Sequence, residues 1–475
     1  MRLFPPMTKP PMNRTLAFLN RYKLPLLLAS AAAVRLIVLL AFPIFAFDQT
    51  GVIHGSGSFD RLAVNLLETG VYGLTPGTPD AMLPPLYSYV LAGVYGLLGR
   101  GALQVGLFHI ALDLLSITML VEIGRRLMPR GAWVGWLAGV FYAFYPYLIF
   151  QNLTVIDTPL FMTLFYALIL GVIVLRERER LDRGTWLLAI GCGVVLGLAT
   201  LGRAILPPFA LLVAVWFLFR RSLAQTVLRL LPVAVVCVAV LIPWIARNYD
   251  VYGTFVLMSV TAGSNLYQGN NPDVIPFLRA GYDVQWTSPD EDTPNTPEGD
   301  RRRTELALQY LRENPGDIPE LIWVKLLTHW SIDIFPRLNP ASGEVPRLDY
   351  QGDALREVDE EGDLSLGGLP EGDPVTAYAQ PLFDQIGRAV HRVYFGVLFA
   401  LALVGIALTL PHWRDVSLLW FVQISMTLIY VLFHPSTRYR VPTDPLLFLF
   451  SAYTIVWLWL KLRARGKLVP APDLA

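Results

Sequence analysis

Long apolar stretches separated by short polar segments dominate the chain. A transmembrane helix needs about 20 predominantly apolar residues, and stretches of this kind predict ten membrane-spanning helices. The predicted spans cover residues 24–47, 103–124, 131–149, 158–175, 184–202, 205–219, 230–246, 393–411, 416–433 and 445–460. The first stretch is too long for the apolar part of a signal peptide, so it is interpreted as a transmembrane helix. The pattern predicts an all-α polytopic membrane protein.

The basic residues predict how these spans are oriented. Lys and Arg accumulate in cytoplasmic loops, and clusters occur at residues 125–130, 176–183, 220–229 and 461–467. All four clusters lie on one side only if the apolar segment 84–98 does not cross the membrane. That segment is short and begins with Pro84-Pro85, so we expect it to lie at the outer interface. Both chain ends are then cytoplasmic, and residues 48–102 and 247–392 are outside.

A second ambiguous segment, residues 319–338, is predicted to lie at the interface as well. Lys325, His329 and Asp333 recur every four residues and share one helical face, with apolar residues around them. Three ionisable groups are costly in a membrane span, so an amphipathic interfacial helix fits better. The predicted organisation is a transmembrane core with its first outer loop over 1–246, an extracytoplasmic region over 247–392, and C-terminal helices with a cytoplasmic tail over 393–475.

Composition supports the membrane interpretation. Charged residues make up 16% of the chain, against about 25% in soluble domains. The net charge of +1 gives no indication of a nucleic-acid partner. Cys192 and Cys237 lie in apolar stretches, which favours small buried side chains over a disulfide or a metal site. Residues 344–373 contain ten acidic residues and two arginines, which predicts a solvated loop, with an acidic substrate filter as the alternative.

Carboxylates beside the spans are the first candidates for chemistry. Placing an ionisable group in or next to an apolar helix costs free energy, so such groups are functional candidates by default. Asp157 lies at the outer mouth of the fourth span, where it serves either as a helix N-cap or as a catalytic carboxylate. Asp48 directly follows the first span. Asp60 lies in the stretch 59–67, whose apolar residues recur at helical spacing.

Cationic and amide side chains near the same surface are candidates for binding. Arg203, Arg247, Arg438 and Arg440 lie at outer ends of spans, against the positive-inside trend. They are either snorkelling or capping residues, or a cage for a phosphate. The amide-rich segment 263–272 suits sugar hydroxyls, although a loop of turns needs the same residues. The predicted substrate-binding residues are Arg203, Arg247, Asn248, Asn265, Tyr267, Asn270, Lys325, Arg438, Tyr439 and Arg440.

Acids and cations at one membrane surface are what transfer from a lipid-linked phosphosugar requires. A carboxylate deprotonates or orients the acceptor hydroxyl. Cations stabilise the charge that develops on the departing phosphate. The lipid tail of the donor explains a site at the edge of the bilayer.

These motifs together resemble the bacterial GT-C glycosyltransferases that are akin to dolichyl-phosphate-mannose protein mannosyltransferases and to the aminoarabinose transferases of lipid A. The resemblance runs from about residue 24 to residue 460. The motifs that carry it are Phe59-Asp60-Arg61, Pro84-Pro85-Leu86-Tyr87, Gly202-Arg203, Pro243-Trp244, Arg247-Asn248, Gly269-Asn270-Asn271-Pro272 and Arg438-Tyr439-Arg440.

The resemblance implies a GT-C fold in a bacterial inner membrane and inverting transfer on the extracytoplasmic side. The implied partners are a polyprenyl-phosphate-linked sugar, membrane lipids and an acceptor glycan, lipid or protein. Arg203, Arg247 and Arg440 take the phosphate side in this pattern. No cofactor is indicated with certainty, and a divalent metal stays open.

One position departs from the family pattern. The catalytic acid of the family falls at Gly55 in this chain. Asp48, Asp60 or His54 has replaced it, or the alignment shifts in this loop, or the activity is altered. We rank Asp48 first because it directly follows the first span, while Asp157 matches the second acidic position of the family.

Two other classes of function stay open from the sequence. A transporter or lipid translocase needs ionisable groups along a midplane pathway, and Arg35, Asp113 and Glu122 are the exceptions that lie within spans. A non-catalytic lipid-glycan-binding subunit is suggested by Gly55 at the position of the acid.

Overall fold

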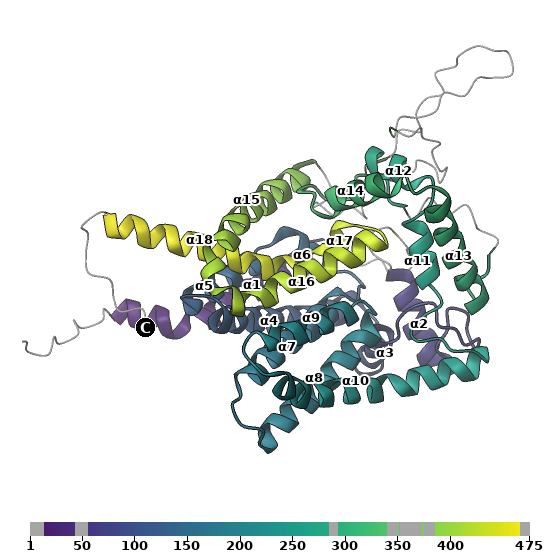
Figure 1. Ribbon diagram of the computed structural model, residues 1–475, viewed down its shortest axis with the longest axis horizontal. Helices are drawn as coiled ribbons and strands as arrows, with labels where there is room; N and C mark the ends of the chain where they lie inside the picture. Colours follow the sequence, from purple (N-terminus) through teal and green to yellow (C-terminus); the bar gives the residue numbers. More distant parts are fainter. Residues whose placement is uncertain are drawn as a thin grey trace, which may run out of the picture.

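The computed structural model describes residues 14–42, 56–284, 293–339, 351, 373–374 and 385–465. Its long helices lie side by side in one bundle (Figure 1). The bundle helices are α1 (Arg14–Ala41), α4 (Ala102–Leu127), α5 (Gly131–Ala143), α7 (Thr158–Glu177), α8 (Arg183–Gly202), α9 (Pro207–Leu218), α10 (Leu223–Tyr252), α15 (Gln385–Thr409), α16 (Trp413–Leu432) and α18 (Asp444–Arg465). They correspond to the ten predicted spans.

Length and composition support the membrane assignment. In the part of the chain that the structure describes, seven helical stretches are long and apolar enough to cross a membrane. The longest of them, Gln385–Leu432, contains both α15 and α16, which the short 3-10 helix η4 (Leu410–His412) joins. α5 and α9 are shorter apolar helices. The all-α polytopic prediction is therefore confirmed, with an approximate span count.

The remaining helices collect mainly at one end of the bundle. They are α2 (Ser56–Thr69), α3 (Leu86–Leu98), α6 (Pro146–Gln151), α11 (Ala262–Gln268), α12 (Val274–Ala280), α13 (Pro297–Glu313), α14 (Ile318–His329) and α17 (Thr437–Arg440). Two short strands, β1 (Leu338–Asn339) and β2 (Asp373–Pro374), pair antiparallel. Figure 1 shows α2 and α11 to α14 at one end, while the free ends of α1 and α18 lie at the other. We call the first of these the platform end.

The predicted span 131–149 is divided in the structure. α5 ends at Ala143, and α6 begins at Pro146. Tyr145 between them has an extended backbone, with φ −72° and ψ 109°. A residue before proline is disfavoured in the helical region, and Pro146 has no N–H to continue the hydrogen-bond ladder. The chain therefore turns before it reaches Asp157.

The ends of two other spans also differ from the prediction. α10 continues to Tyr252, past the domain boundary expected at residue 246. α1 ends at Ala41, before the expected end at residue 47. Arg247 consequently lies on a helix rather than in a loop.

Small residues allow close packing between bundle helices. A Cβ atom on Gly193 or Gly197 of α8 would lie 2.7 Å from the Cβ of Val236 or Val240, respectively, on α10. Glycines four residues apart present one face of a helix and let two backbones approach each other, as is common in membrane bundles. This contact places the platform ends of α8 and α10 side by side.

α14 is the interfacial helix expected in 319–338, but it ends at His329, so Asp333 lies beyond it. Lys325 and His329 are buried, whereas Ile322, Trp323 and Leu327 are exposed. The polar face thus packs inward against α16, and the apolar face points outward. This orientation suits a helix whose exposed side contacts lipid.

Candidate active site

The centre of the candidate site is an ion pair between Asp157 and Arg203. Arg203 Nε and Nη2 donate to the two oxygens of Asp157 at 2.6 and 2.7 Å. Nη2 also donates to Thr158 Oγ1 at 2.8 Å. Both side chains are 9% exposed. The Asp157 side chain makes no capping bond to α7, so its oxygens hold the guanidinium instead of the helix start.

Further charged and aromatic groups surround this pair. Burial acts to raise the pKa of Asp157, but the Arg203 guanidinium outweighs it and holds that pKa below its ordinary value, with Arg438 acting in the same direction. Tyr430 and Tyr439 stack with ring centroids 4.9 Å apart, and both act electrostatically on Arg203. The Arg438 guanidinium lies over the Tyr439 ring at 5.4 Å. Arg203, Arg438 and Tyr439 are therefore brought together with Asp157.

Lys325 extends this neighbourhood from α14. Its Nζ donates to Asn270 Oδ1 at 3.0 Å and to the main-chain oxygen of Val431 at 3.1 Å. Burial lowers the pKa of Lys325 to about 7. Burial also lowers the pKa of His434 to about 4, and both Lys325 and Arg438 add to that effect. Lys325 and Asn270 thus lie on the same side of the bundle as Arg438.

A hydrogen-bond chain holds the segment that leads to Asp157. His109 Nδ1 lies 2.8 Å from the main-chain oxygen of Asn152, which can only accept, so Nδ1 carries the proton. His109 Nε2 then accepts from the Tyr87 hydroxyl at 3.0 Å. Asn152 Nδ2 donates to Asp113 Oδ1 at 2.6 Å. Helices α3 and α4 therefore fix the backbone five residues before Asp157.

Asp60 is buried on α2 and makes different contacts. Arg100 Nε and Nη2 donate to its two oxygens at 2.9 and 2.7 Å. The Tyr95 hydroxyl donates to Oδ1 at 2.7 Å. The carboxylate thus joins α2 to the end of α3. Asp60 and Asp157 both act electrostatically on Tyr87, so the two acids lie within electrostatic range of the same tyrosine.

Arg247 and Asn248 support the loop between α2 and α3. Arg247 Nη2 donates to the main-chain oxygen of Tyr72 at 2.7 Å, and Nη1 donates to that of Asp80 at 2.6 Å. Asn248 Oδ1 accepts from Arg247 Nη1 at 3.1 Å, and its Nδ2 donates to the oxygen of Val256. These contacts position protein backbone, and they are separate from the contacts of Arg203.

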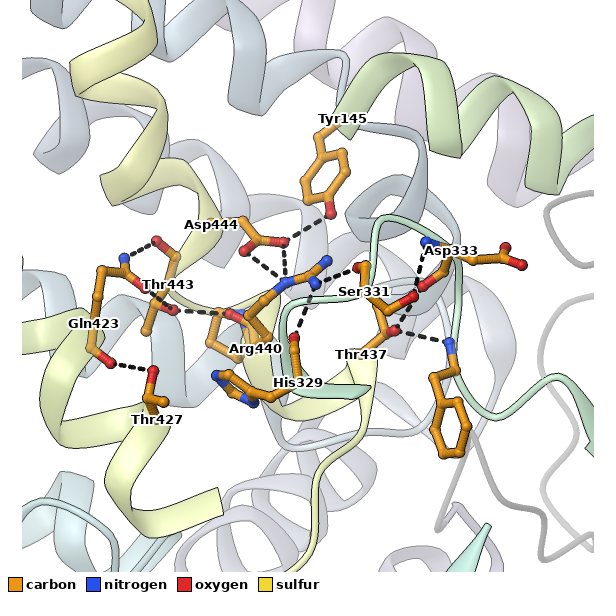
Figure 2. Close-up of polar contacts among 12 residues, drawn as sticks. Tyr145, His329, Ser331, Asp333, Gln423, Thr427, Thr437, Arg440, Thr443 and Asp444 are labelled. Carbon is orange, nitrogen blue, oxygen red and sulfur yellow. Dashed lines mark hydrogen bonds and ion pairs between the residues drawn. The ribbon is translucent and has the colours of Figure 1, made fainter. Parts of the chain in front are cut away.

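Arg440 joins α17, α18 and the segment after α14, as Figure 2 shows. Its Nε donates to Asp444 Oδ1 at 3.1 Å, and its Nη1 donates to the main-chain oxygens of His329 and Ser331 at 3.0 and 2.6 Å. Tyr145 donates to Asp444 Oδ2 at 2.8 Å. Arg440 is fully buried. Arg203, Arg247 and Arg440 therefore make three separate sets of contacts within the protein, and their shared place on the phosphate side stays a prediction.

The other predicted residues lie on α11 or outside the described part of the chain. Asn265 is exposed on α11, and Tyr267 is buried on the same helix. Asp48 and His54 lie outside the described residues. Among the residues that the structure describes, no group of three or more His, Cys, Asp and Glu side chains could hold a metal ion.

Sequence reasoning missed Tyr430, His434 and His109, which contribute to the site or to its support. Tyr430 and His109 lie within apolar spans, where an aromatic residue or a single histidine is an ordinary core residue. The available signal was weak: His434 comes four residues before Arg438, in a segment already singled out. Only packing shows that these side chains face Asp157 and its neighbours.

Comparisons with known proteins agree with this architecture. Residues 83–246 match the family described as dolichyl-phosphate-mannose-protein mannosyltransferase. That segment contains both Asp157 and Arg203. No curated protein sequence matches the chain.

Two solved archaeal structures share the fold over almost the whole chain. The oligosaccharyltransferase of Archaeoglobus fulgidus, tethered with an acceptor peptide, is 13% identical with a TM-score of 0.53; the match covers 95% of this chain and 51% of that one. The same archaeal enzyme, AglB, with an inhibitory peptide and a dolichol-phosphate, matches at 13% identity and TM-score 0.53, covering 96% and 53%. ArnT from Cupriavidus metallidurans bound to undecaprenyl phosphate matches at 14% identity and TM-score 0.39, covering 94% and 81%.

The chain spans about half the length of the archaeal structures that it matches. Their likeness over almost all of this chain concerns the arrangement of helices, because so few residues are identical. The chain is thus a polytopic membrane protein with the GT-C glycosyltransferase fold, and its residues 83–246 match the mannosyltransferase family.

Proposed function

We propose that the chain transfers a sugar, with inversion, from a polyprenyl-phosphate donor to an acceptor glycan, lipid or protein on the extracytoplasmic face of a bacterial inner membrane. The observation that carries the proposal is the buried Asp157–Arg203 pair, with Arg438 and Lys325 close by. Two guanidinium groups and one amine lie in this region together with the carboxylates of Asp157 and Asp283, which acts on Tyr439. Lys325 adds positive charge when it is protonated, below its pKa of about 7.

The two guanidinium groups fit the phosphate of such a donor. The acceptor oxygen attacks the anomeric carbon from the side opposite the phosphate, and the bond between that carbon and the phosphate oxygen breaks. The electron pair leaves with the polyprenyl phosphate, whose charge rises as the bond opens. Guanidinium groups match phosphate oxygens in geometry, and fixed cations lower the barrier because they are in place before the charge develops. Arg203 and Arg438 take this role.

The proton of the acceptor hydroxyl passes to a carboxylate. Asp157 is ionised at neutral pH because Arg203 holds its pKa low, which makes it a weak base. This suits Asp157 to orienting Arg203 and to accepting a hydrogen bond from the hydroxyl. Asp48 remains the first candidate for the proton acceptor.

α14 offers a place for the lipid tail of the donor. Ile322, Trp323 and Leu327 form an exposed apolar face on this helix. Lys325 lies on the opposite, buried face of the same two turns. A polyprenyl chain along the outer face would leave its phosphate at the level of the cations.

Mass spectrometry of glycans from cells with and without the chain tests the proposal. Asp157→Asn and Asp48→Asn should each remove the chain-dependent glycan while the protein remains folded in the membrane. Asp250→Asn is the control, because Asp250 is exposed on α10. If both site variants keep near wild-type turnover, the catalytic assignment is wrong. Uptake of an unchanged substrate by proteoliposomes would favour a transporter instead.

A further inference from the structure

A cavity lies at the end of the bundle opposite to the platform end. Its volume is about 700 Å³, and the ends of α4, α7, α9 and α16 line it. Asp157 precedes the first residue of α7, and Arg176 lies in its last turn. A helix of 20 residues is about 30 Å long at 1.5 Å per residue. The cavity and the candidate active site therefore lie at opposite membrane surfaces.

The lining of this cavity is strongly basic. It includes five arginines and two carboxylates, namely Arg126, Arg176, Arg220, Arg221, Arg414, Glu177 and Asp415. Three positive charges remain after every carboxylate is matched with an arginine. Single-sign charge in a partly enclosed, low-dielectric site attracts a counter-ion of the opposite sign.

The contacts within the cavity show which arginines are paired with a carboxylate. Arg176 and Arg220 share the Asp415 carboxylate, with contacts of 2.5 Å each. Arg221 donates to the main-chain oxygens of Arg176 and Arg178 at 2.7 and 3.1 Å. The Arg414 guanidinium lies 5.6 Å from the centre of the Trp413 ring, and in the described part of the chain no carboxylate forms an ion pair with it. In the described residues, therefore, no carboxylate neutralises the charge of Arg414 or Arg221.

The cavity also opens onto a surface suited to acyl chains. Leu218 lines it, and Leu211, Val215 and Leu218 are 72%, 41% and 45% exposed. Their spacing of four and three residues places them on one face of α9. Trp216 lies under the Arg176 guanidinium at 3.4 Å. A basic group beside aromatic rings, followed by an apolar stripe, matches the sequence of headgroup, interface and hydrocarbon in a leaflet.

We propose that this cavity binds the phosphate headgroup of an anionic phospholipid, whose acyl chains lie along the exposed face of α9. Basic cavities between the cytoplasmic ends of transmembrane helices recognise such headgroups. The site is separate from the sugar-transfer site and does not depend on it. Its lipid belongs to the leaflet opposite the one facing Asp157. The bound headgroup would link the ends of α4, α7, α9 and α16 through the arginines that lie on these helices or directly after them.

Thermal unfolding of the full chain in neutral detergent tests the proposal. Phosphatidylglycerol should raise the unfolding temperature progressively as its concentration increases, whereas phosphatidylcholine and inorganic phosphate at the same concentration and ionic strength should not. A ligand that binds only the folded state stabilises it in proportion to the logarithm of its concentration. An equal shift with phosphatidylcholine would overturn the proposal, and an equal shift with inorganic phosphate would assign the cavity to a soluble anion instead.

Arg414→Gln with Arg220→Gln is the variant that tests the location. Each lost guanidinium should weaken phosphatidylglycerol binding roughly fivefold, or about 25-fold together. Asp415 keeps Arg176 as its partner in this variant. Arg463→Gln is the matched control, because Arg463 is exposed and also lies over a tryptophan ring, that of Trp459, at 4.3 Å. An equal loss of phosphatidylglycerol binding in Arg463→Gln would show that binding depends only on surface charge, and it would overturn the assignment to this cavity.

A direct measurement covers the case in which the double variant does not fold. A photoactivatable phosphatidylglycerol should crosslink to peptides at the ends of α9 and α16 in the wild-type chain, and excess unlabelled phosphatidylglycerol should compete. Crosslinks spread evenly over the lipid-facing helices would contradict the proposal.

Discussion

Two buried arginine–aspartate pairs occupy different depths of the bundle, and their surroundings separate a structural pair from a functional one. Arg35–Asp113 joins α1 to α4, with side chains 0% and 1% exposed, and Arg203–Asp157 lies at the platform end with both side chains 9% exposed. Their shortest contacts are both 2.6 Å. Each arginine also keeps one buried nitrogen without a hydrogen-bond partner, so this feature does not distinguish them.

The neighbours of each pair do distinguish them. Asp113 accepts from Tyr142 and Asn152 at 2.9 and 2.6 Å, and Arg35 donates to the main-chain oxygen of Ala143 at 2.8 Å. One cation and one anion are neutral together, and their other hydrogen-bond partners are neutral groups. Arg203–Asp157 has further charged groups around it: Arg438 acts on Asp157, and Asp283 acts on the neighbouring Tyr439. Several charged groups at one place suit a charged ligand, whereas an isolated balanced pair joins helices.

The largest expected effect comes from removing one member of the balanced pair. Asp113→Ala leaves Arg35 as an uncompensated buried charge and should destabilise the fold by about 3–5 kcal/mol. Thermal unfolding in detergent measures this loss. Replacing both residues by leucine should recover much of it, because the unpaired charge is gone. Equal stability of Asp113→Ala and the wild type would contradict a structural role.

The next prediction distinguishes Arg203 from Arg35 by the property that each substitution changes, turnover or stability. Arg203→Lys keeps a positive charge opposite Asp157 but loses the planar fork, and it should lower turnover by about 10²–10³-fold, as the loss of one fixed donor to a developing anion does. Arg35→Lys should lower stability instead. Turnover per folded molecule is the measurement, with Arg301→Lys on the exposed side of α13 as control. The comparison fails if Arg35→Lys costs as much turnover per folded molecule as Arg203→Lys.

Arg247 gives a smaller effect on the loop between α2 and α3. Arg247→Lys cannot reach the main-chain oxygens of Tyr72 and Asp80 in the same geometry, and a charged hydrogen bond contributes about 1.5–3 kcal/mol. Stability should fall by that amount, and turnover should fall only as far as the folded fraction does. A fall in turnover at unchanged stability would instead return Arg247 to the phosphate side of the site.

The smallest effect is a pH dependence from Lys325. Its pKa is about 7 in the folded protein, below the ordinary value of 10.5. Between these values the unfolded chain binds more protons, so stability should rise with pH by up to about 1.4 kcal/mol per unit. Below pH 7 Lys325 is protonated in both the folded and the unfolded state, so the cost of burying its charge no longer changes with pH. Unfolding temperatures from pH 6 to 9 should show this slope in the wild type and a flatter one in Lys325→Met, and parallel slopes would argue against it.

The sequence predicted the bundle but only part of the site. Hydropathy identified the spans because the bilayer imposes length and apolarity on each helix separately. It placed Asp157 and Arg203 at span ends for the same reason. Pro146 was visible in the sequence as a possible break. Hydropathy averaged over an apolar stretch does not detect a turn, however, when the backbone N–H and C=O groups of that turn are hydrogen-bonded inside the protein.

What only the tertiary structure decided is which polar groups face one another. Arg203, Arg247 and Arg440 look alike in the sequence, yet the first binds a carboxylate beside other cations, the second binds loop backbone, and the third fixes α17 and α18. The inward direction of Lys325 likewise depends on where α16 packs. The membrane sets the length and apolarity of each span independently of the other spans, so the local sequence determines where the spans lie. Each polar pairing joins residues that are far apart in the chain, and only the packing of the helices brings them together.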